Sequence, residues 1–414
     1  MRADGRLVRA AAAACLLPVL TVAACDGGGP AKERKESHAC TPSATGAGRC
    51  TVRVPGLDTV TTVAATSASD LWFFALPQAT GEHWDGRAWH RFPLRLPPDY
   101  APDDVRVVGP ADIWVAAQTS SRPAPTVFAH WDGRTWTDHP AAPWQLTGIP
   151  DPTRFLPAPS AAGLWATEGS DRLERWDGQN WRAVKAPGIA DTGTAAPASP
   201  GAGEVWVATG TAVDHWTGTA WQRLDLPAGD WADALATGPG GDLWVSVHPD
   251  LSRHLHQLLH REGSSWRQVP VTSTLGSFDG QLTADGQGGL WLSVSPAQGT
   301  DPVANGGLAA ATVDRRGLHG AVGGLVHRTA AGAVTEVAGP RPPYATLAAG
   351  APTNEHKRLP APWRDEIRTM LLAVVPGTGT VWFAQRHKLY SPGLEGAYNE
   401  DYSRGDLTLL QRYG

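Results

Sequence analysis

The sequence predicts an all-β fold, a seven-bladed β-propeller closed by an N-terminal clasp strand. A phrase centred on tryptophan recurs seven times, mostly at intervals of about 40–50 residues, the length of a four-stranded blade. A second phrase, centred on Asp-Gly, follows most copies of the first. The two ends of the chain each carry part of one blade. These three observations lead to the propeller.

The tryptophan phrase is predicted to be a strand buried on both faces. In "EVWVATG", Val205 and Val207 lie on one face, Trp206 and Ala208 lie on the other, and both faces are apolar. In six copies the residue two after the tryptophan is small, so large and small side chains alternate and neighbouring blades interlock. Phe74 is the exception. The seven tryptophans are Trp72, Trp114, Trp165, Trp206, Trp244, Trp291 and Trp382.

The second phrase, "HWDGRAW" from His83, is predicted to join the two outer strands of a blade as a hairpin. Asp-Gly favours a tight turn because glycine adopts positive φ and aspartate accepts backbone N–H bonds. A loop over Asp85–Ala88 would place Trp84 directly opposite Trp89, and such cross-strand aromatic pairs contribute roughly 0.2–1 kcal/mol each. We therefore interpret the repeated tryptophans as scaffold and not as a sugar-binding motif.

The last blade is incomplete at the C-terminus. Its final copy stops at "LLQRYG", where the Asp-Gly turn would stand. The N-terminal stretch "RCTVRVPGL", Arg49–Leu57, looks like an outermost strand with no blade before it. We expect this stretch to be the clasp strand of the seventh blade, which leaves no open sheet edge at the junction.

Residues 1–25 have the pattern of a signal peptide, with arginines followed by an apolar run too short to span a bilayer comfortably. The run ends in "VAAC", which resembles a bacterial lipobox and implies lipidation of Cys25, including palmitate-type acylation. An ordinary secretory signal with a chance cysteine is the alternative. Residues 26–49 then form a flexible linker, and residues 50–414 the propeller. Cys40 and Cys50 remain as a predicted disulfide pair, the alternative being two free thiols.

The repeats resemble those of extracytoplasmic bacterial propellers, of the Asp-box, YVTN-like and WD-like kinds. They lack the Gly-His opening and the terminal Trp-Asp of eukaryotic WD repeats. The resemblance covers Cys50–Gly414 and implies the fold. It implies no particular activity.

Composition and motifs exclude several function classes. The net charge of −5 gives no basic stripe for nucleic acid. The motifs G-x-S-x-G, HExxH and CxxC are absent from the sequence. In "RHLHQLLH", His254, His256 and His260 share one face of a presumed strand, where two of them could hold a metal. Because His260 is also a repeat position, we favour a structural role.

The connections that lead into the innermost strands carry the candidate binding residues. Tryptophans outside the repeat and other aromatics, Tyr100, Phe278 and Tyr344, fall in these connections and are predicted to surround the channel mouth, although they could instead pack onto blade edges. An aspartate recurs there in all seven blades. The aspartates cap local turns, which we favour, or together attract a cation such as Ca²⁺ or a basic partner. The candidates are Trp144, Trp231, Trp363, Asp58, Asp104, Asp151, Asp191, Asp233, Asp279 and Asp365.

From these features we expect a lipid-anchored binding protein on the outer face of the cell membrane. It would be a monomer without a resident metal or cofactor, and its channel mouth would take a protein, peptide or glycan. A propeller enzyme, either a lyase or a glycan-acting hydrolase, is one alternative, and a passive subunit of an envelope assembly is another. Two long Gly/Pro/Ala-rich excursions, residues 296–324 and 339–366, are either functional loops or tolerated insertions.

Overall fold

The computed structural model divides the chain into two compact units, Met1–Ser37 and His38–Gly414. The described residues all belong to the second unit. They are residues 50–51, 54–57, 60–119, 126–141, 153–155, 164–168, 172–184, 194–198, 204–238, 241–249, 256–295, 310–314, 317–319, 323–339, 353–354, 357–358, 363–375, 379–390 and 406–413.

In each of the first four blades, four antiparallel strands follow in chain order from the inner to the outer strand, and the inner strand of blade 4 also pairs in parallel with that of blade 5 through Ala196 and Ala234. Blade 1 consists of β2 (Thr62–Ser67), β3 (Asp70–Ala75), β4 (Thr80–Trp84) and β5 (Trp89–Pro93), with a short 3-10 helix η1 (Leu76–Gln78) between β3 and β4. Blade 2 consists of β6 (Tyr100–Gly109), β7 (Asp112–Thr119), β8 (Val127–Trp131) and β9 (Trp136–Pro140). Blade 3 consists of β10 (Thr153–Phe155), β11 (Trp165–Glu168), β12 (Arg172–Trp176) and β13 (Trp181–Val184). Blade 4 consists of β14 (Thr194–Ala198), β15 (Val205–Thr209), β16 (Ala212–Trp216) and β17 (Trp221–Asp225).

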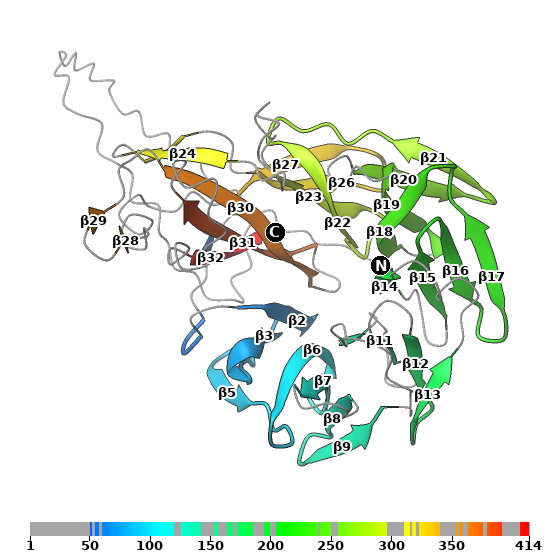
Figure 1. The fold of residues 1–414 in the computed structure, drawn as a ribbon, viewed down its shortest axis with the longest axis vertical. Helices are drawn as coiled ribbons and strands as arrows, with labels where there is room; N and C mark the ends of the chain where they lie inside the picture. Colours follow the sequence, from blue (N-terminus) through cyan, green and yellow to red (C-terminus); the bar gives the residue numbers. More distant parts are fainter. Residues whose placement is uncertain are drawn as a thin grey trace, which may run out of the picture. The chain divides into compact units, whose positions relative to one another are not determined.

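The other three blades complete the seven-bladed propeller. Blade 5 consists of β18 (Asp230–Thr237), β19 (Leu243–Pro249), β20 (Gln257–Glu262) and β21 (Ser265–Val269). Blade 6 consists of β22 (Ser277–Ala284), β23 (Leu290–Ser295), β26 (Gly324–Arg328) and β27 (Val334–Ala338). Blade 7 consists of β30 (Trp363–Val374), β31 (Val381–Tyr390), β32 (Asp406–Tyr413) and β1 (Cys50–Thr51). The sheets follow one another in sequence order (Figure 1), and the predicted all-β, seven-bladed propeller is confirmed.

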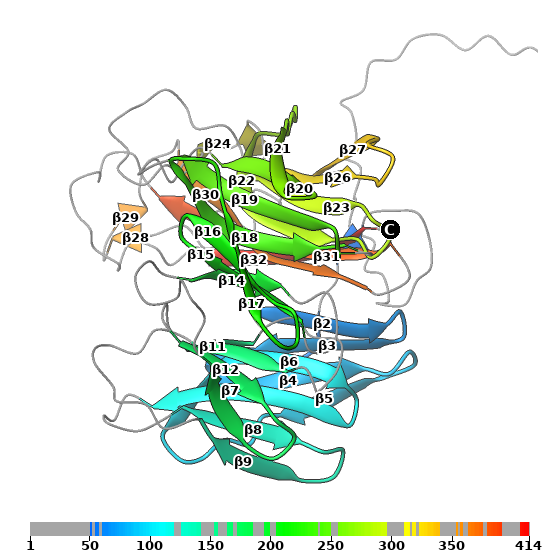
Figure 2. The same cartoon turned by 90° about the vertical axis from the view of Figure 1, so that its right-hand side faces the viewer.

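The second strand of each blade is covered on both faces, as the tryptophan phrase predicts. Val205 and Val207 of β15 pack with Trp165 of blade 3. On the opposite face, Trp206 and Ala208 share a core cluster with residues of blade 5. The core is therefore a series of layers between facing sheets, and Figure 2 shows β2–β5 stacked on β6–β9 in this way.

Phe74, the one large residue at the small position, is accommodated by a glycine. Phe74 is fully buried and stacks at 6.3 Å from Trp72. Directly across the sheet it pairs with Gly81, where a Cβ atom would lie only 2.6 Å from the Phe74 ring. The missing side chain on β4 therefore supplies the space that a small residue supplies in the other blades.

The Asp-Gly turns also form as predicted. Trp84 pairs directly with Trp89, and their ring centroids lie 5.4 Å apart. One carboxylate oxygen of Asp85 accepts the N–H groups of Arg87 and Ala88, both at 2.8 Å, while Gly86 has φ of 90°. The bond from Ala88, with a further bond from His90, holds the pKa of Asp85 well below its usual range. The turn therefore depends on an ionised aspartate.

At the predicted clasp, β1 pairs antiparallel with β32 through Cys50 with Arg412 and Thr51 with Gln411. The strand is shorter than Arg49–Leu57, because Pro55 and Gly56 form a turn, with φ of 67° at Gly56. Val54 and Leu57 are buried against Trp382 of blade 7 and Trp84 of blade 1. Arg49, residues 52–53 and Cys40 lie outside the described residues, so the full clasp and the disulfide stay predictions.

The two long excursions contain strands. In the first, β24 (Ala310–Asp314) and β25 (Gly317–His319) form a hairpin, and β24 pairs with the beginning of β30 in blade 7. In the second, β28 (Thr353–Asn354) pairs with β29 (Lys357–Arg358). The excursion of blade 6 therefore extends the sheet of the next blade.

Within the part of the chain that the structure describes, no helix has the length and apolar character needed to cross a membrane.

Candidate functional site

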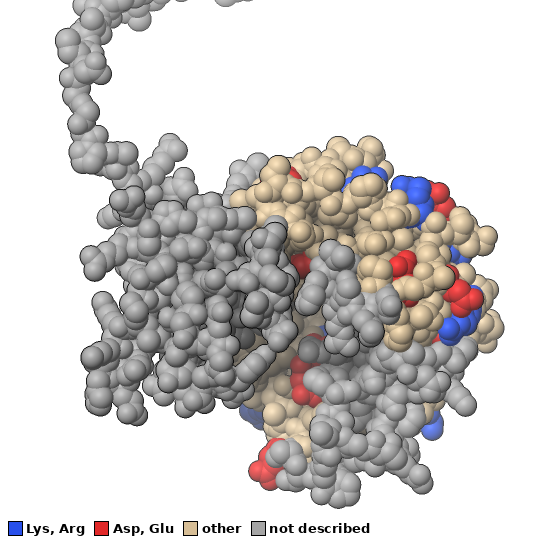
Figure 3. All heavy atoms as spheres, turned by 45° about the horizontal axis from the view of Figure 1, so that its top comes forward, with Lys and Arg blue, Asp and Glu red and all other residues tan. Residues whose placement is uncertain are grey.

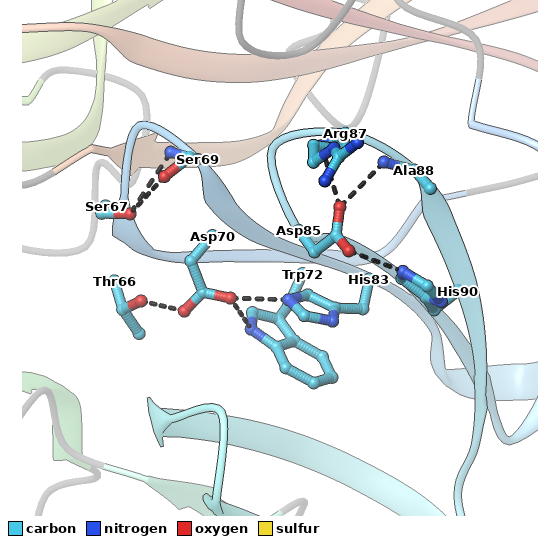
Figure 4. A network of polar contacts seen from close by, with 10 residues as sticks. All are labelled: Thr66, Ser67, Ser69, Asp70, Trp72, His83, Asp85, Arg87, Ala88 and His90. Carbon is cyan, nitrogen blue, oxygen red and sulfur yellow. Dashed lines mark hydrogen bonds and ion pairs between the residues drawn. The ribbon is translucent and has the colours of Figure 1, made fainter.

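The two ends of the blades carry different chemistry. We call the end at which the inner strands begin the mouth face, and the end with the Asp-Gly turns the turn face. A carboxylate, an imidazole and an indole recur together at the turn face of five blades. In blade 1, the Nε2 atom of His83 lies 2.6 Å from Asp70, and its ring stacks at 3.8 Å on Trp72 (Figure 4). Asp70 also accepts the indole N–H of Trp72 at 3.1 Å.

The other four copies have the same carboxylate–imidazole contact and ring stacking, and Trp114 of blade 2 also donates its indole N–H to Asp112, at 2.9 Å. The carboxylate–imidazole distances are 3.0, 3.5, 2.7 and 2.9 Å, and the rings stack at 4.1, 3.7, 4.0 and 4.3 Å. Each group joins the second strand of its blade, or the residues just before it, to the third strand, so the repeated histidine is structural. The groups are Asp112–His130–Trp114, Glu204–His215–Trp206, Asp242–His260–Trp244 and Asp285–His327–Trp291.

Sequence reasoning did not single out these carboxylates, although a signal was present. An acidic residue stands two positions before the tryptophan in four copies, as Asp70, Asp112, Glu204 and Asp242. For His260 the favoured structural role agrees with its bond to Asp242 at 2.7 Å. His254 lies outside the described residues. Among the residues that the structure describes, no group of three or more His, Cys, Asp or Glu could hold a metal ion.

The side chains of three of the seven predicted aspartates are described. Asp104 accepts the N–H of Val105 at 3.0 Å, a local backbone bond. Asp279 accepts the N–H of Gln281 at 3.4 Å and the hydroxyls of Ser293 and Ser295 in the neighbouring strand. Asp365 pairs through its backbone with Ala311 and Leu389. The remaining three, Asp58, Asp151 and Asp191, lie outside the described residues.

Of the three candidate tryptophans, Trp231 is described most fully. It is the second residue of β18, is half-buried, and pairs with His248 of β19. Trp363 is the first residue of β30 and pairs with Val313 of β24, while its side chain is not described. Trp144 and Tyr344 lie outside the described residues.

The third aspartate with a described side chain, Asp233, forms a cluster with two histidines that was not predicted as a set. One oxygen of Asp233 lies 2.9 Å from Nδ1 of His256, and the other lies 3.4 Å from Nε2 of His248. The exposed fractions are 30% for Asp233, 12% for His248 and 15% for His256, so solvent reaches the carboxylate more than the rings. These residues come from β18, β19 and the position immediately before β20, which meet at the mouth face. We call them, with Asp230 and Trp231, the blade-5 cluster.

Two residues of blade 6 pack against His256. The rings of His256 and Phe278 meet edge-on, with their centroids 6.2 Å apart. A Cβ atom at Gly280 would lie 2.7 Å from Nδ1 of His256, and the φ of Gly280 is 92°. Gly280 therefore allows the imidazole to approach the inner strand of blade 6 while it faces Asp233. The sequence signal is the "FDGQ" phrase, in which the glycine follows the repeated aspartate.

The geometry determines how protons are shared in the blade-5 cluster. An ionised carboxylate only accepts hydrogen bonds, so each imidazole presents an N–H to Asp233. The other nitrogen of each neutral ring, Nδ1 of His248 and Nε2 of His256, is then an acceptor. Burial raises the pKa of nearby Asp230, and His248 partly offsets this effect. The cluster can therefore accept hydrogen bonds from a donor.

Comparisons with known proteins support the fold and leave the activity open. No protein-family model and no curated protein matches the chain. The chain is similar to a GH74 xyloglucanase from Xanthomonas campestris, with a TM-score of 0.51 and 14% identity over 88% of this chain and 55% of that one. It is also similar to YCF48 bound to D1 peptide, with a TM-score of 0.49 and 15% identity over 91% and 98%. A streptogramin B lyase has a TM-score of 0.48 and 12% identity over 88% and 96%. Likeness at such identities concerns the fold.

Proposed function

We propose that this chain is a binding protein that uses the mouth face of its propeller for a protein or peptide ligand. A lipid on Cys25 would hold it at the outer face of the cell membrane. The single observation that carries the proposal is the blade-5 cluster, in which Asp233 is shared by two imidazoles. A half-buried tryptophan, Trp231, stands beside them. A glycan remains the third ligand class that such aromatic and polar groups would suit.

The repeated groups of the turn face support this choice of face. There the carboxylates and imidazoles bond to one another and stack on core tryptophans such as Trp72 and Trp244. In the blade-5 cluster the Nδ1 atom of His248 is buried without a hydrogen-bond partner among the described residues, as is Nε2 of His215 at the turn face. Solvent nonetheless reaches the blade-5 cluster at the carboxylate of Asp233, which is 30% exposed. A buried acceptor without a partner costs free energy that a bound donor would recover.

The binding proposal predicts that a photoreactive residue at position 231 captures the ligand on intact cells. Trp231→p-benzoylphenylalanine keeps an aromatic group at the mouth face, so the adduct should appear as one discrete product, identified by mass spectrometry. Arg134→p-benzoylphenylalanine, on the exposed turn of blade 2, is the matched control at the turn face. Adducts formed equally from both positions, or only from position 134, would contradict the choice of face.

The anchoring proposal rests on the "VAAC" phrase and predicts a change in location. Because a lipobox cysteine carries the acyl chains, Cys25→Ser should release the protein into the medium or leave its signal peptide uncleaved. The unchanged protein should take up labelled palmitate and fractionate with membranes. Cys15→Ser, inside the signal peptide, is the control and should change neither result. An unchanged protein that is free in the medium and unlabelled would mean an ordinary secretory signal.

Acid–base catalysis is a second candidate function, favoured by one observation. The carboxylate of Asp233 orients the imidazole of His256 at 2.9 Å, which is how carboxylates position a histidine that acts as a general base. Incubation of the unmodified protein with the ligand that cross-linking identifies separates the two candidates. A binding protein leaves the mass of the ligand unchanged, whereas a lyase or hydrolase gives a cleaved product.

A further inference from the structure

We propose that the blade-5 cluster binds a primary ammonium group, such as a lysine side chain of the ligand. This inference rests on the proposed function and names the chemical group that the mouth face recognises. The site consists of Asp230, Trp231 and Asp233 from β18, with His248 from β19 and His256 immediately before β20. Phe278 lies at its edge in blade 6.

The charges around the site favour a cation. The sequences of β18, β19 and β22 contain three aspartates, Asp230, Asp233 and Asp279, and no lysine or arginine. The arginine of β20, Arg261, instead stacks on Trp206 of blade 4 at 5.2 Å. In the face that Figure 3 shows, acidic side chains lie within the central hollow, whereas most basic side chains lie toward the rim. Burial of a carboxylate without a nearby cation disfavours its charged form. Burial raises the pKa of Asp230 in this way.

The hydrogen-bonding groups of the site are acceptors. One oxygen of Asp233 is hydrogen-bonded to Nδ1 of His256, and the other lies 3.4 Å from Nε2 of His248. With an N–H on each of these nitrogens, the second nitrogen of each ring offers a lone pair, and Nδ1 of His248 has no hydrogen-bond partner among the described residues. A ligand for this site must therefore donate hydrogen bonds.

A comparison of blades 5 and 6 identifies a further buried group without a partner. In blade 6, the hydroxyl of Ser293, two residues after the repeated tryptophan, donates to Asp279. In blade 5 the same position is Ser246, which is 0% exposed and whose hydroxyl has no partner among the described residues. The two imidazoles contact the oxygens of Asp233, whereas in blade 6 two serine hydroxyls bond to the corresponding Asp279.

The arrangement favours an ammonium over a guanidinium. An arginine fork pairs best with two free oxygens of one carboxylate, and both oxygens of Asp233 are occupied. An ammonium has three donors in a compact group, which can reach the lone pairs of separate rings and the carboxylate of Asp230. The half-buried Trp231 and the edge ring of Phe278 provide aromatic surface for the alkyl stem and the charge.

The test uses the whole propeller and a defined probe, N-acetyl-lysine methylamide, followed by the imidazole proton signals of His248 and His256 in NMR titrations. At pH 7.5 the probe should shift these signals saturably. N-acetyl-norleucine methylamide, which lacks the ammonium, should leave the signals unchanged. The arginine analogue should bind at least fivefold more weakly than the lysine probe.

Variants assign the effect to the site. Asp230→Asn keeps the side-chain size and removes the charge. It should therefore raise the dissociation constant of the lysine probe at least tenfold and leave the melting temperature of the protein unchanged. Asp138→Asn, on the exposed strand β9, should have no effect on binding. Equal binding of the lysine and norleucine probes, or no loss in Asp230→Asn, would overturn the ammonium site. If position 231 still captures a ligand on cells, such a result leaves the binding proposal in place. Failure to capture a ligand at position 231 would instead count against the binding proposal.

Discussion

A chain that begins at Asp58 is expected to unfold at a much lower temperature than one that begins at Gly46. The shorter chain lacks β1, which pairs with Arg412 and Gln411 of β32, and leaves the outer edge of β32 without that partner. It also lacks Val54 and Leu57, which are buried between blades 7 and 1. Burying two such side chains contributes about 3–6 kcal/mol to the free energy of unfolding, from about 1.5–3 kcal/mol each. Scanning calorimetry on both chains measures the difference.

The chain beginning at Gly46 is the control, because it keeps the whole predicted strand and removes only preceding linker residues. The exposed edge of β32 should also make the shorter chain self-associate, which size-exclusion chromatography detects. If both chains unfold at the same temperature and remain monomeric, the clasp does not close the propeller. Blade 7 would then be stable without its N-terminal strand.

Trp206→Ala is expected to lower the free energy of unfolding by about 3–5 kcal/mol, the range for a large aromatic side chain removed from a core. Trp206 is nearly fully buried between blades 4 and 5. Its ring stacks on His215 at 3.7 Å, and Arg261 lies 5.2 Å from its centroid. The substitution therefore leaves a cavity and removes the contact that orients His215. Chemical denaturation of the variant measures the loss.

Val334→Ala on β27 is the control for this substitution. Val334 is 52% exposed, so its truncation should change the free energy of unfolding by no more than about 0.5 kcal/mol. A loss in Trp206→Ala as small as that of the control would contradict the interpretation of the repeated tryptophans as scaffold. It would also reopen a ligand-binding role for them.

The comparison of Phe74 with Asp233 shows where sequence reasoning succeeds and where it stops. Phe74 departs from the repeat, but its partner Gly81 is opposite in the adjacent strand, and the two departures compensate. Asp233 follows the repeat and yet has partners that the repeat does not predict. Its partners, His248 and His256, stand 15 and 23 residues later at the ends of two other strands. A recurring residue type indicates a recurring position, and the neighbours decide what that residue binds.

The sequence by itself determined the number of blades, the buried second strand and the Asp-Gly turns. These features depend on short-range patterns, such as the alternation around Trp206 and the turn preference of Asp85 and Gly86, and most copies repeat them. The tertiary structure decided the pairing of β24 with β30 and the sharing of Asp233 by two histidines. These contacts join segments that are distant in the chain, and which of them form depends on the space that other blades leave. Local preference contains no information about that space.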